Sequence, residues 1–266
     1  MDNRPIGVFD SGVGGLTSIS AFKHVLPEEN LIYFGDTARA PYGSKTPAAI
    51  CQFSLQIADF LVSQGAKMLV IACNTITSVA LSEIQKAHPD IPVQGIIEPA
   101  AEEIANQCTP ENSIGVIATM VTTQSRAYEN ALHNFKGNLN VHSMACPAFV
   151  PLIEEGAVES ETMEITVHRY LDNFVANNKI DTLVLGCTHY PIIEKMIDKC
   201  CPGLNIIDPS MSLAKASKKL LLEKDMLAER KSTKNVFYAS DLSPDFINMM
   251  NRLGIDGDFS VEQHRF

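Results

Sequence analysis

The chain lacks three features that would each indicate a class of protein. No segment approaches the roughly 18 consecutive apolar residues of a membrane-spanning helix. No C-x-x-C pair occurs, so the cysteine spacing does not fit a zinc site. Basic residues are not in excess, because the formal net charge is −10, and this argues against a nucleic-acid-binding surface. We therefore expect no membrane partner, no nucleic-acid partner and no metal.

A secretory signal and disulfides are also not expected. Residues 1–5 lead directly into a short apolar segment, without the longer apolar region of a signal peptide, so we expect a cytoplasmic protein. The seven cysteines are an odd number, and cytoplasmic cysteines stay reduced. With 45% hydrophobic and 20% charged residues, the 266-residue chain has an ordinary globular composition and ample length for a buried core.

Short apolar segments alternate with longer segments of helical pattern. In residues 46–64, for example, Ile50, Phe53 and Ile57 follow the spacing of a helix face. The expected strands are residues 6–10, 31–35, 67–72, 91–97, 113–118, 139–143, 181–186, 204–207 and 234–238. The expected helices are residues 14–26, 46–64, 75–88, 99–107, 122–134, 160–177, 190–200, 211–228 and 243–252. This alternation predicts an α/β fold with parallel sheets covered on both faces.

The sequence contains an internal repeat. Residues 69–75 and 183–189 are each an apolar run that ends in a cysteine followed by small polar residues, and a Gly-Val strand precedes each one. We therefore predict two similar parallel-sheet α/β units, an internal pseudo-duplication. The first unit comprises residues 1–97 plus 209–266, and the second comprises residues 98–208. Because ligands of α/β sheets bind beyond the carboxyl ends of strands, we expect the site in the cleft between the units.

The two repeated cysteines, Cys73 and Cys187, are the leading candidates for chemistry. A lone cysteine after an apolar strand is more often a small buried hydrophobe. Two cysteines in matching contexts weaken that interpretation, and a following helix N-terminus favours the reactive thiolate. Two opposed thiols can remove a proton from one face of a carbon and return one to the other face. The pattern indicates a two-base site.

Two further residues next to these strands have both a functional and a structural interpretation. Asp10 opens the glycine-rich turn of residues 10–15, where it either caps the next helix or belongs to the site. The glycine spacing is not that of a dinucleotide-binding fingerprint, and no phosphate-binding lysine follows. His189 lies two residues after Cys187, which favours proton exchange between imidazole and thiol over a purely structural role.

The sequence alone does not decide the role of two segments. The loop of residues 35–43, rich in turn residues, is either a substrate-enclosing loop or a surface turn. Residues 149–156 end in glutamates before a glycine, typical of a solvated helix end, so Glu154 matters only if the fold brings it to Cys187. The remaining cysteines, which lack comparable contexts, are interpreted as packing residues: Cys51, Cys108, Cys146, Cys200 and Cys201.

Taken together, these segments resemble the glutamate racemases. The matching segments, in the order of that family, are residues 7–16, 33–39, 41–43, 72–75, 97–99, 149–155 and 185–191. The resemblance extends from residue 6 to about residue 210 and thins after that. It implies an isomerase that interconverts L- and D-glutamate without a cofactor, supplies D-glutamate for peptidoglycan synthesis and forms a homodimer. A pyridoxal enzyme would need a Schiff-base lysine, and none of these motifs contains one.

The resemblance also implies residue roles. Cys73 and Cys187 are the two bases, with Asp10 supporting proton transfer at Cys73 and His189 at Cys187. Asp36 and Glu154 are auxiliary acidic groups. The implied substrate contacts are Asp10, Ser11, Tyr42, Gly43, Asn74, Thr75, Thr188 and His189.

Three alternatives compete with this hypothesis. A racemase of aspartate or another amino acid would share both cysteines and differ in the polarity of the pocket around the side-chain carboxylate. A cysteine hydrolase with a Cys–His pair needs one nucleophile and an oxyanion hole, so it leaves the second cysteine without a role. A non-enzymatic module that binds a small acid would retain binding when both cysteines are replaced.

Overall fold

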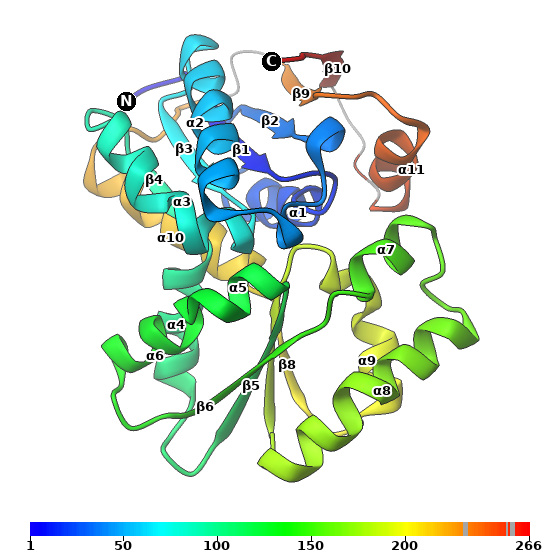
Figure 1. Ribbon diagram of the computed structural model, residues 1–266. Coiled ribbons are helices and arrows are strands. Elements are labelled where there is room, and N and C mark those ends of the chain that lie inside the picture. Colours follow the sequence, from blue (N-terminus) through cyan, green and yellow to red (C-terminus); the bar gives the residue numbers. More distant parts are fainter. Residues whose placement is uncertain (231–233, 254, 256–258) are drawn as a thin grey trace.

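Two parallel β-sheets, one in each half of the molecule, form the framework of the chain (Figure 1). The structure is a computed structural model that describes residues 1–230, 234–253, 255 and 259–266, so its gaps fall within the predicted unit segment 209–266. The first sheet has the strand order β10-β9-β2-β1-β3-β4, and the second has the order β6-β5-β7-β8. Every neighbouring pair is parallel. The predicted fold class, α/β with two parallel-sheet units, is confirmed.

The repeat found in the sequence appears in the strand order. The strands of the first sheet are β1 (Ile6–Asp10), β2 (Leu31–Gly35), β3 (Met68–Ile71), β4 (Val93–Gly95), β9 (Asn235–Ala239) and β10 (Phe259–Gln263). Those of the second are β5 (Ser113–Ala118), β6 (Asn140–Ala145), β7 (Thr182–Gly186) and β8 (Asn205–Ile207). The order β2-β1-β3-β4 of the first sheet corresponds to β6-β5-β7-β8 of the second. The strands β3 and β7, which precede the two cysteines, therefore occupy equivalent positions.

Helices cover both sheets. They are α1 (Leu16–Val25), α2 (Pro47–Ser63), α3 (Asn74–Ala87), α4 (Ile97–Gln107), α5 (Met120–Ser125), α6 (Ala127–Phe135), α7 (Phe149–Glu154), α8 (Glu161–Asn178), α9 (Glu194–Cys200), α10 (Ser210–Glu223) and α11 (Pro244–Arg252). Short 3-10 helices also lie at Thr37–Arg39, Tyr42–Ser44 and Tyr190–Ile193. No helix in the described part of the chain is long and apolar enough to cross a membrane.

The first sheet is buried on both faces, which explains its nearly continuous apolar strands. Within β3, Leu69 and Ile71 pack in the cluster that includes residues of α2 and α3, whereas Met68 and Val70 pack in the cluster that includes residues of α1 and α10. Successive side chains of a strand point to opposite faces, so a strand covered on both sides has no polar face.

Several predicted elements differ from the structure. The prediction of one helix over residues 122–134 is wrong, because Arg126 has a φ of 56° and separates α5 from α6. The predicted strand over residues 91–97 is too long, because β4 covers only Val93–Gly95 and α4 begins at Ile97. Glu98 and Pro99 lie in the first turn of that helix, where an acidic residue and proline are favourable. The edge strand β10 was not predicted. Its sequence supplies only Phe259 and Val261 as apolar residues, a pattern too short to detect.

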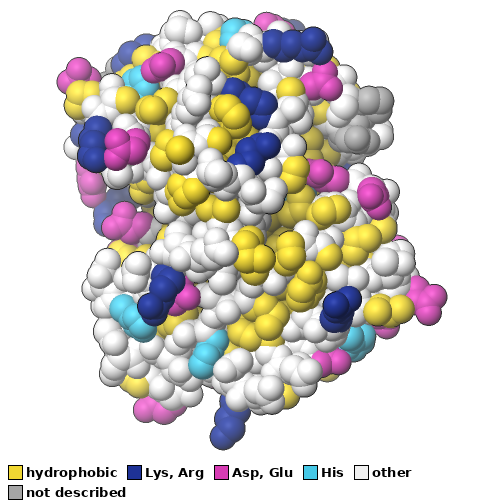
Figure 2. Space-filling model, viewed as in Figure 1, with side chains coloured by type: hydrophobic (Ala, Val, Ile, Leu, Met, Phe, Trp, Pro, Cys, Tyr) yellow, Lys and Arg dark blue, Asp and Glu magenta, His cyan; other side chains and the backbone are white. Residues whose placement is uncertain are grey.

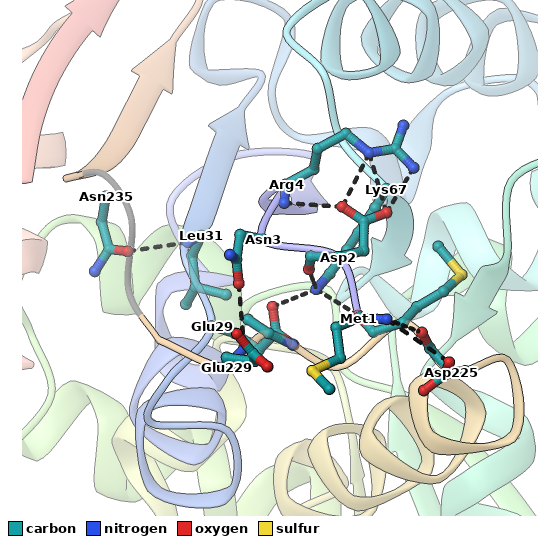
Figure 3. A network of polar contacts seen from close by, with 12 residues as sticks. Met1, Asp2, Asn3, Arg4, Glu29, Leu31, Lys67, Asp225, Glu229 and Asn235 are labelled. Atoms are coloured by element: carbon teal, nitrogen blue, oxygen red, sulfur yellow. Dashed lines mark hydrogen bonds and ion pairs between the residues drawn. The ribbon is translucent and has the colours of Figure 1, made fainter.

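A buried ion pair between Lys67 and Glu29 lies where the N-terminal residues meet the segment that follows α10 (Figure 3). Lys67 Nζ lies 2.7 Å from Glu29 Oε2, and both side chains are almost completely buried. The same ammonium group donates to the carbonyl oxygens of Asp2 at 2.5 Å and Met226 at 2.7 Å. Glu29 also accepts the backbone N–H of Ala228 at 2.8 Å. One cation therefore links the segment of Lys67 to three other segments of the chain.

Candidate active site

A cavity of about 430 Å³ lies at the carboxyl ends of strands from both sheets. Its wall includes Ser11 after β1, Cys73 after β3, Thr119 after β5 and Cys187 after β7. On the face shown in Figure 2, hydrophobic side chains gather along the junction of the two halves, and Lys and Arg are interspersed with Asp and Glu. The cavity matches the general position of ligand sites in α/β proteins, and both units contribute to it.

On one side of the cavity, Cys73 stands at the N-terminus of α3. Its Sγ accepts the backbone N–H of Ile76 at 3.4 Å and contacts Ser11 Oγ at 3.5 Å. Burial and the nearby negative charge of Asp10 raise the pKa of Cys73 well above its ordinary value, although the contacts with Ser11 and Ile76 partly oppose that shift. This environment favours the neutral thiol of Cys73.

Asp10 lies behind the cavity wall and not on it. Its carboxylate accepts the backbone N–H groups of Gly12 at 3.2 Å and Gly15 at 2.9 Å. The hydroxyl of Thr188 donates to the other carboxylate oxygen at 3.4 Å. A Cβ on Gly15 would lie only 2.5 Å from that of Asp10, so the close approach of this turn requires glycine. Asp10 therefore connects the turn after β1 to the segment after Cys187.

On the other side, Cys187 belongs to a chain of three polar side chains. Its Sγ lies 3.9 Å from His189 Nδ1, and His189 Nε2 lies 2.9 Å from Glu154 Oε1. Burial by itself lowers the pKa of His189, but hydrogen bonds and charge interactions with Cys187 and Glu154 outweigh it and raise the pKa to about 10. His189 is therefore an imidazolium at neutral pH, and a cation beside a sulfur stabilises a thiolate.

The pKa of His189 predicts how protein stability depends on pH. The folded pKa of about 10 lies above the ordinary value of 6.5. The stabilisation is therefore fully present below pH 6.5 and is lost as the pH rises through about 10. Urea unfolding of the protein and of His189→Asn should show the largest difference at pH 6.5 and below, and a shrinking difference as the pH rises toward about 10. A difference that stays constant or grows with pH would contradict this assignment.

The loop after β2 contributes Tyr42 and Gly43 to the cavity wall. The hydroxyl of Tyr42 donates to the carboxylate of Asp36. Asp36 is itself fully buried, and it accepts Ser240 Oγ at 2.7 Å and Arg39 Nε at 2.6 Å. Asp36 does not line the cavity. It connects with the site through Tyr42 and through its backbone N–H, which donates to the carbonyl oxygen of Asp10 at 3.2 Å. The loop of residues 35–43, for which the sequence allowed two interpretations, thus lines the cavity.

The remaining predicted contacts, Asn74, Thr75 and Thr188, also line the cavity. Thr75 Oγ1 is 2.9 Å from Thr119 Oγ1, a contact between the two units. Sequence reasoning missed Thr119, although the repeat offered a signal, since residue 119 follows β5 as Ser11 follows β1. It also interpreted Cys146 only as a packing residue, whereas this buried cysteine lies on the cavity wall.

Outside the cavity, one group of side chains in the described ranges has the geometry to hold a metal ion: Glu164, His168 and Cys200. None of the three lines the cavity. Lys199 Nζ lies 2.8 Å from Glu164, and Asp172 lies 2.9 Å from His168 Nδ1. These ion pairs account for the cluster, and we assign no metal to it.

Comparisons with known proteins agree with this geometry. The model of the Asp/Glu/Hydantoin racemase family matches residues 18–216. The chain is 43% identical over 240 residues to a glutamate racemase of Neisseria meningitidis, covering 90% of this chain and 88% of the relative. It is 42% identical over 258 residues to that of Persephonella marina, covering 97% and 96%. The fold and the site thus define a member of the Asp/Glu/hydantoin racemase family.

Solved structures narrow this class. The glutamate racemase of Francisella tularensis subsp. tularensis SCHU S4, solved in complex with D-glutamate, has a TM-score of 0.92 and 39% identity, covering 99% of this chain and 98% of that chain. Picrophilus torridus aspartate racemase shares only the fold, with a TM-score of 0.54, 16% identity and coverage of 82% and 94%. The chain belongs to the glutamate racemases.

Proposed function

We propose that this chain interconverts L- and D-glutamate, with Cys73 and Cys187 as acid and base on opposite faces of Cα. The observation that carries the proposal is the arrangement of the two thiols, which follow equivalent strands of two similar sheets and line one cavity. The choice of glutamate is supported by the relatives, one of which was solved with D-glutamate and another, from Escherichia coli, with L-glutamate.

The proton transfer follows from the two different environments of the thiols. The sulfur of a thiolate takes the proton from Cα, and the electron pair of the broken C–H bond stays on the carbon. The opposite S–H then donates its proton to the other face, which leaves a thiolate there and inverts the centre. Asp10 and burial keep Cys73 as a thiol, which suits Cys73 as the proton donor. His189 Nδ1 lies 3.9 Å from Cys187 Sγ and places a positive charge beside the sulfur that is proposed to remove the proton.

The carbanion needs stabilisation because an α-proton is a much weaker acid than a thiol. Hydroxyl and amide groups of Ser11, Asn74, Thr75 and Thr188 line the cavity and are suited to bind the substrate carboxylates. The cavity wall also includes apolar residues such as Val150, which restrict water at the reacting carbon. The reaction balances without an oxidant, a reductant or a further co-reactant, so we propose no cofactor.

The biological setting is also a proposal, and it is supported only by the membership of the family. D-Glutamate made by this chain would enter peptidoglycan synthesis in the cytoplasm, and the enzyme would act as a homodimer. We likewise retain the division into residues 1–97 plus 209–266 and residues 98–208 as the boundaries of the two units.

Incubation with L-glutamate in D₂O tests the proposed function. The protein, freed of metal and pyridoxal phosphate, should racemise L-glutamate while deuterium enters the product enantiomer first, since each face has its own base. Optical rotation and deuterium at Cα are followed together. Inversion of aspartate but not glutamate would favour the alternative substrate. If neither amino acid is inverted and a covalent acyl-enzyme forms, the result would support the hydrolase. If neither is inverted and the acid only binds, it would support the binding module.

A further inference from the structure

We propose that Tyr128 is a positioning residue that fixes the side-chain amide of Asn74, so that Asn74 Nδ2 donates to a carboxylate of the substrate. The inference rests on the proposed function and adds a residue that the motifs do not include. Asn74 lines the cavity, whereas Tyr128 does not. Tyr128 would therefore act on the substrate only through Asn74.

The contact crosses from one unit to the other. The hydroxyl of Tyr128, in α6, donates to Asn74 Oδ1 at the start of α3, with an O···O distance of 2.7 Å. Tyr128 is 1% exposed and Asn74 is 2% exposed. Asn74 Nδ2 is buried as well, and within the described residues it has no hydrogen-bond partner. Because buried donors are rarely left unpaired, this nitrogen is a donor for which a carboxylate of the bound substrate would be the partner.

The bond from the phenol occupies the oxygen of the amide and leaves its nitrogen unpaired. A side-chain amide can present either its oxygen or its nitrogen, and a hydroxyl that donates to Oδ1 holds one of these orientations. Burial, with the negative charges of Asp208 and Cys187, raises the pKa of Tyr128 well above its ordinary value, so the hydroxyl keeps its proton. In the reversed orientation, Nδ2 would point at the phenol oxygen and Oδ1 would be the unpaired atom, which would repel a carboxylate instead of donating to it.

The local structure explains how Tyr128 reaches this position. The left-handed conformation of Arg126 ends α5 and starts α6 in a new direction. Next to Cys187, Gly186 leaves room for the ring, since a Cβ there would lie 3.2 Å from Tyr128 Cε2. One side chain therefore packs beside the residue before Cys187 and bonds to the residue after Cys73.

A double-mutant cycle tests the proposal. Tyr128→Phe removes only the hydroxyl, and the KM for L-glutamate should rise about tenfold with a smaller change in kcat, because a carboxylate contact present in the bound substrate is lost. In an Asn74→Ala background, the same change should have almost no further effect on KM, since its target is already absent. Tyr170→Phe is the matched control. Its hydroxyl accepts the N–H of Ala148 at 3.3 Å, and its removal should leave KM unchanged.

Two results would overturn the proposal: an unchanged KM in Tyr128→Phe, or equal losses in both backgrounds. If circular dichroism shows that Tyr128→Phe does not fold, the variant Asn74→Asp tests the proposal instead. It keeps an oxygen for the phenol but replaces the donating nitrogen, so it should weaken glutamate binding at least as much as Asn74→Ala, and a wild-type KM would refute the idea. Failure of the unmodified protein to racemise glutamate would instead refute the proposed function.

Discussion

Replacing Cys73 or Cys187 by alanine should lower kcat for glutamate racemisation by about 10³-fold or more in both directions. Each substitution removes the only proton carrier proposed for one face of Cα, so the centre can no longer invert. The two sulfurs are buried at equivalent strand ends, and alanine fills most of the same space, so the fold should be retained. Polarimetry gives the rates, and circular dichroism with thermal unfolding confirms the folded state.

The matched control is Cys108→Ala, which deletes a buried thiol that does not line the cavity and should keep wild-type kcat. Serine gives a finer test, because its hydroxyl is a weaker acid than a thiol. Cys73→Ser and Cys187→Ser should slow the two directions unequally. Full activity in either alanine variant would refute the assignment of two bases.

Replacing Lys67 by methionine should destabilise the protein by about 3–5 kcal/mol, since breaking a buried ion pair leaves the partner charge uncompensated. The contacts in Figure 3 give the reason. Without the ammonium group, the carboxylate of Glu29 and the carbonyl oxygens of Asp2 and Met226 each lose a donor. The free energy of unfolding in urea is the measurement.

Two further variants identify the cause. In the double variant Lys67→Met with Glu29→Leu, both charges are gone, and stability should recover in part despite the two unpaired carbonyls. Lys86→Met removes the exposed partner of Glu83 and should leave the free energy of unfolding nearly unchanged. A loss below about 1 kcal/mol in Lys67→Met would show that the buried pair does not stabilise the fold.

The cysteine strands could be identified from the sequence because each is a local pattern. A buried parallel strand is an uninterrupted apolar run, and the residues just after it lie at the edge of the sheet where ligands bind. Cys73 and Cys187 satisfy both conditions within seven-residue segments that resemble each other. The strand order then places the two segments equivalently, as the repeat predicts.

The surroundings of the cysteines depended on long-range contacts. From the sequence, Glu154 was expected at the end of a solvated helix unless the fold brought it near Cys187. In the structure, α7 places the carboxylate of Glu154 within hydrogen-bond distance of His189. Asp36, expected as an auxiliary acid, contacts Tyr42 behind the cavity wall. The bond from Tyr128 to Asn74 requires the helix break at Arg126, where the apolar spacing suggested one continuous helix.

The sequence by itself therefore determined the α/β class, the duplication and the two thiols, since these follow from hydrophobic period, chain order and residues adjacent in the chain. Only the tertiary structure decided which groups set the protonation of those thiols and orient the residues that face the substrate. Such partners lie far apart in sequence, as with Asn74 and Tyr128, and they meet only when helices of one unit pack against strand ends of the other. Protonation and hydrogen-bond direction depend on burial and on charges within a few ångströms, and packing alone brings these together.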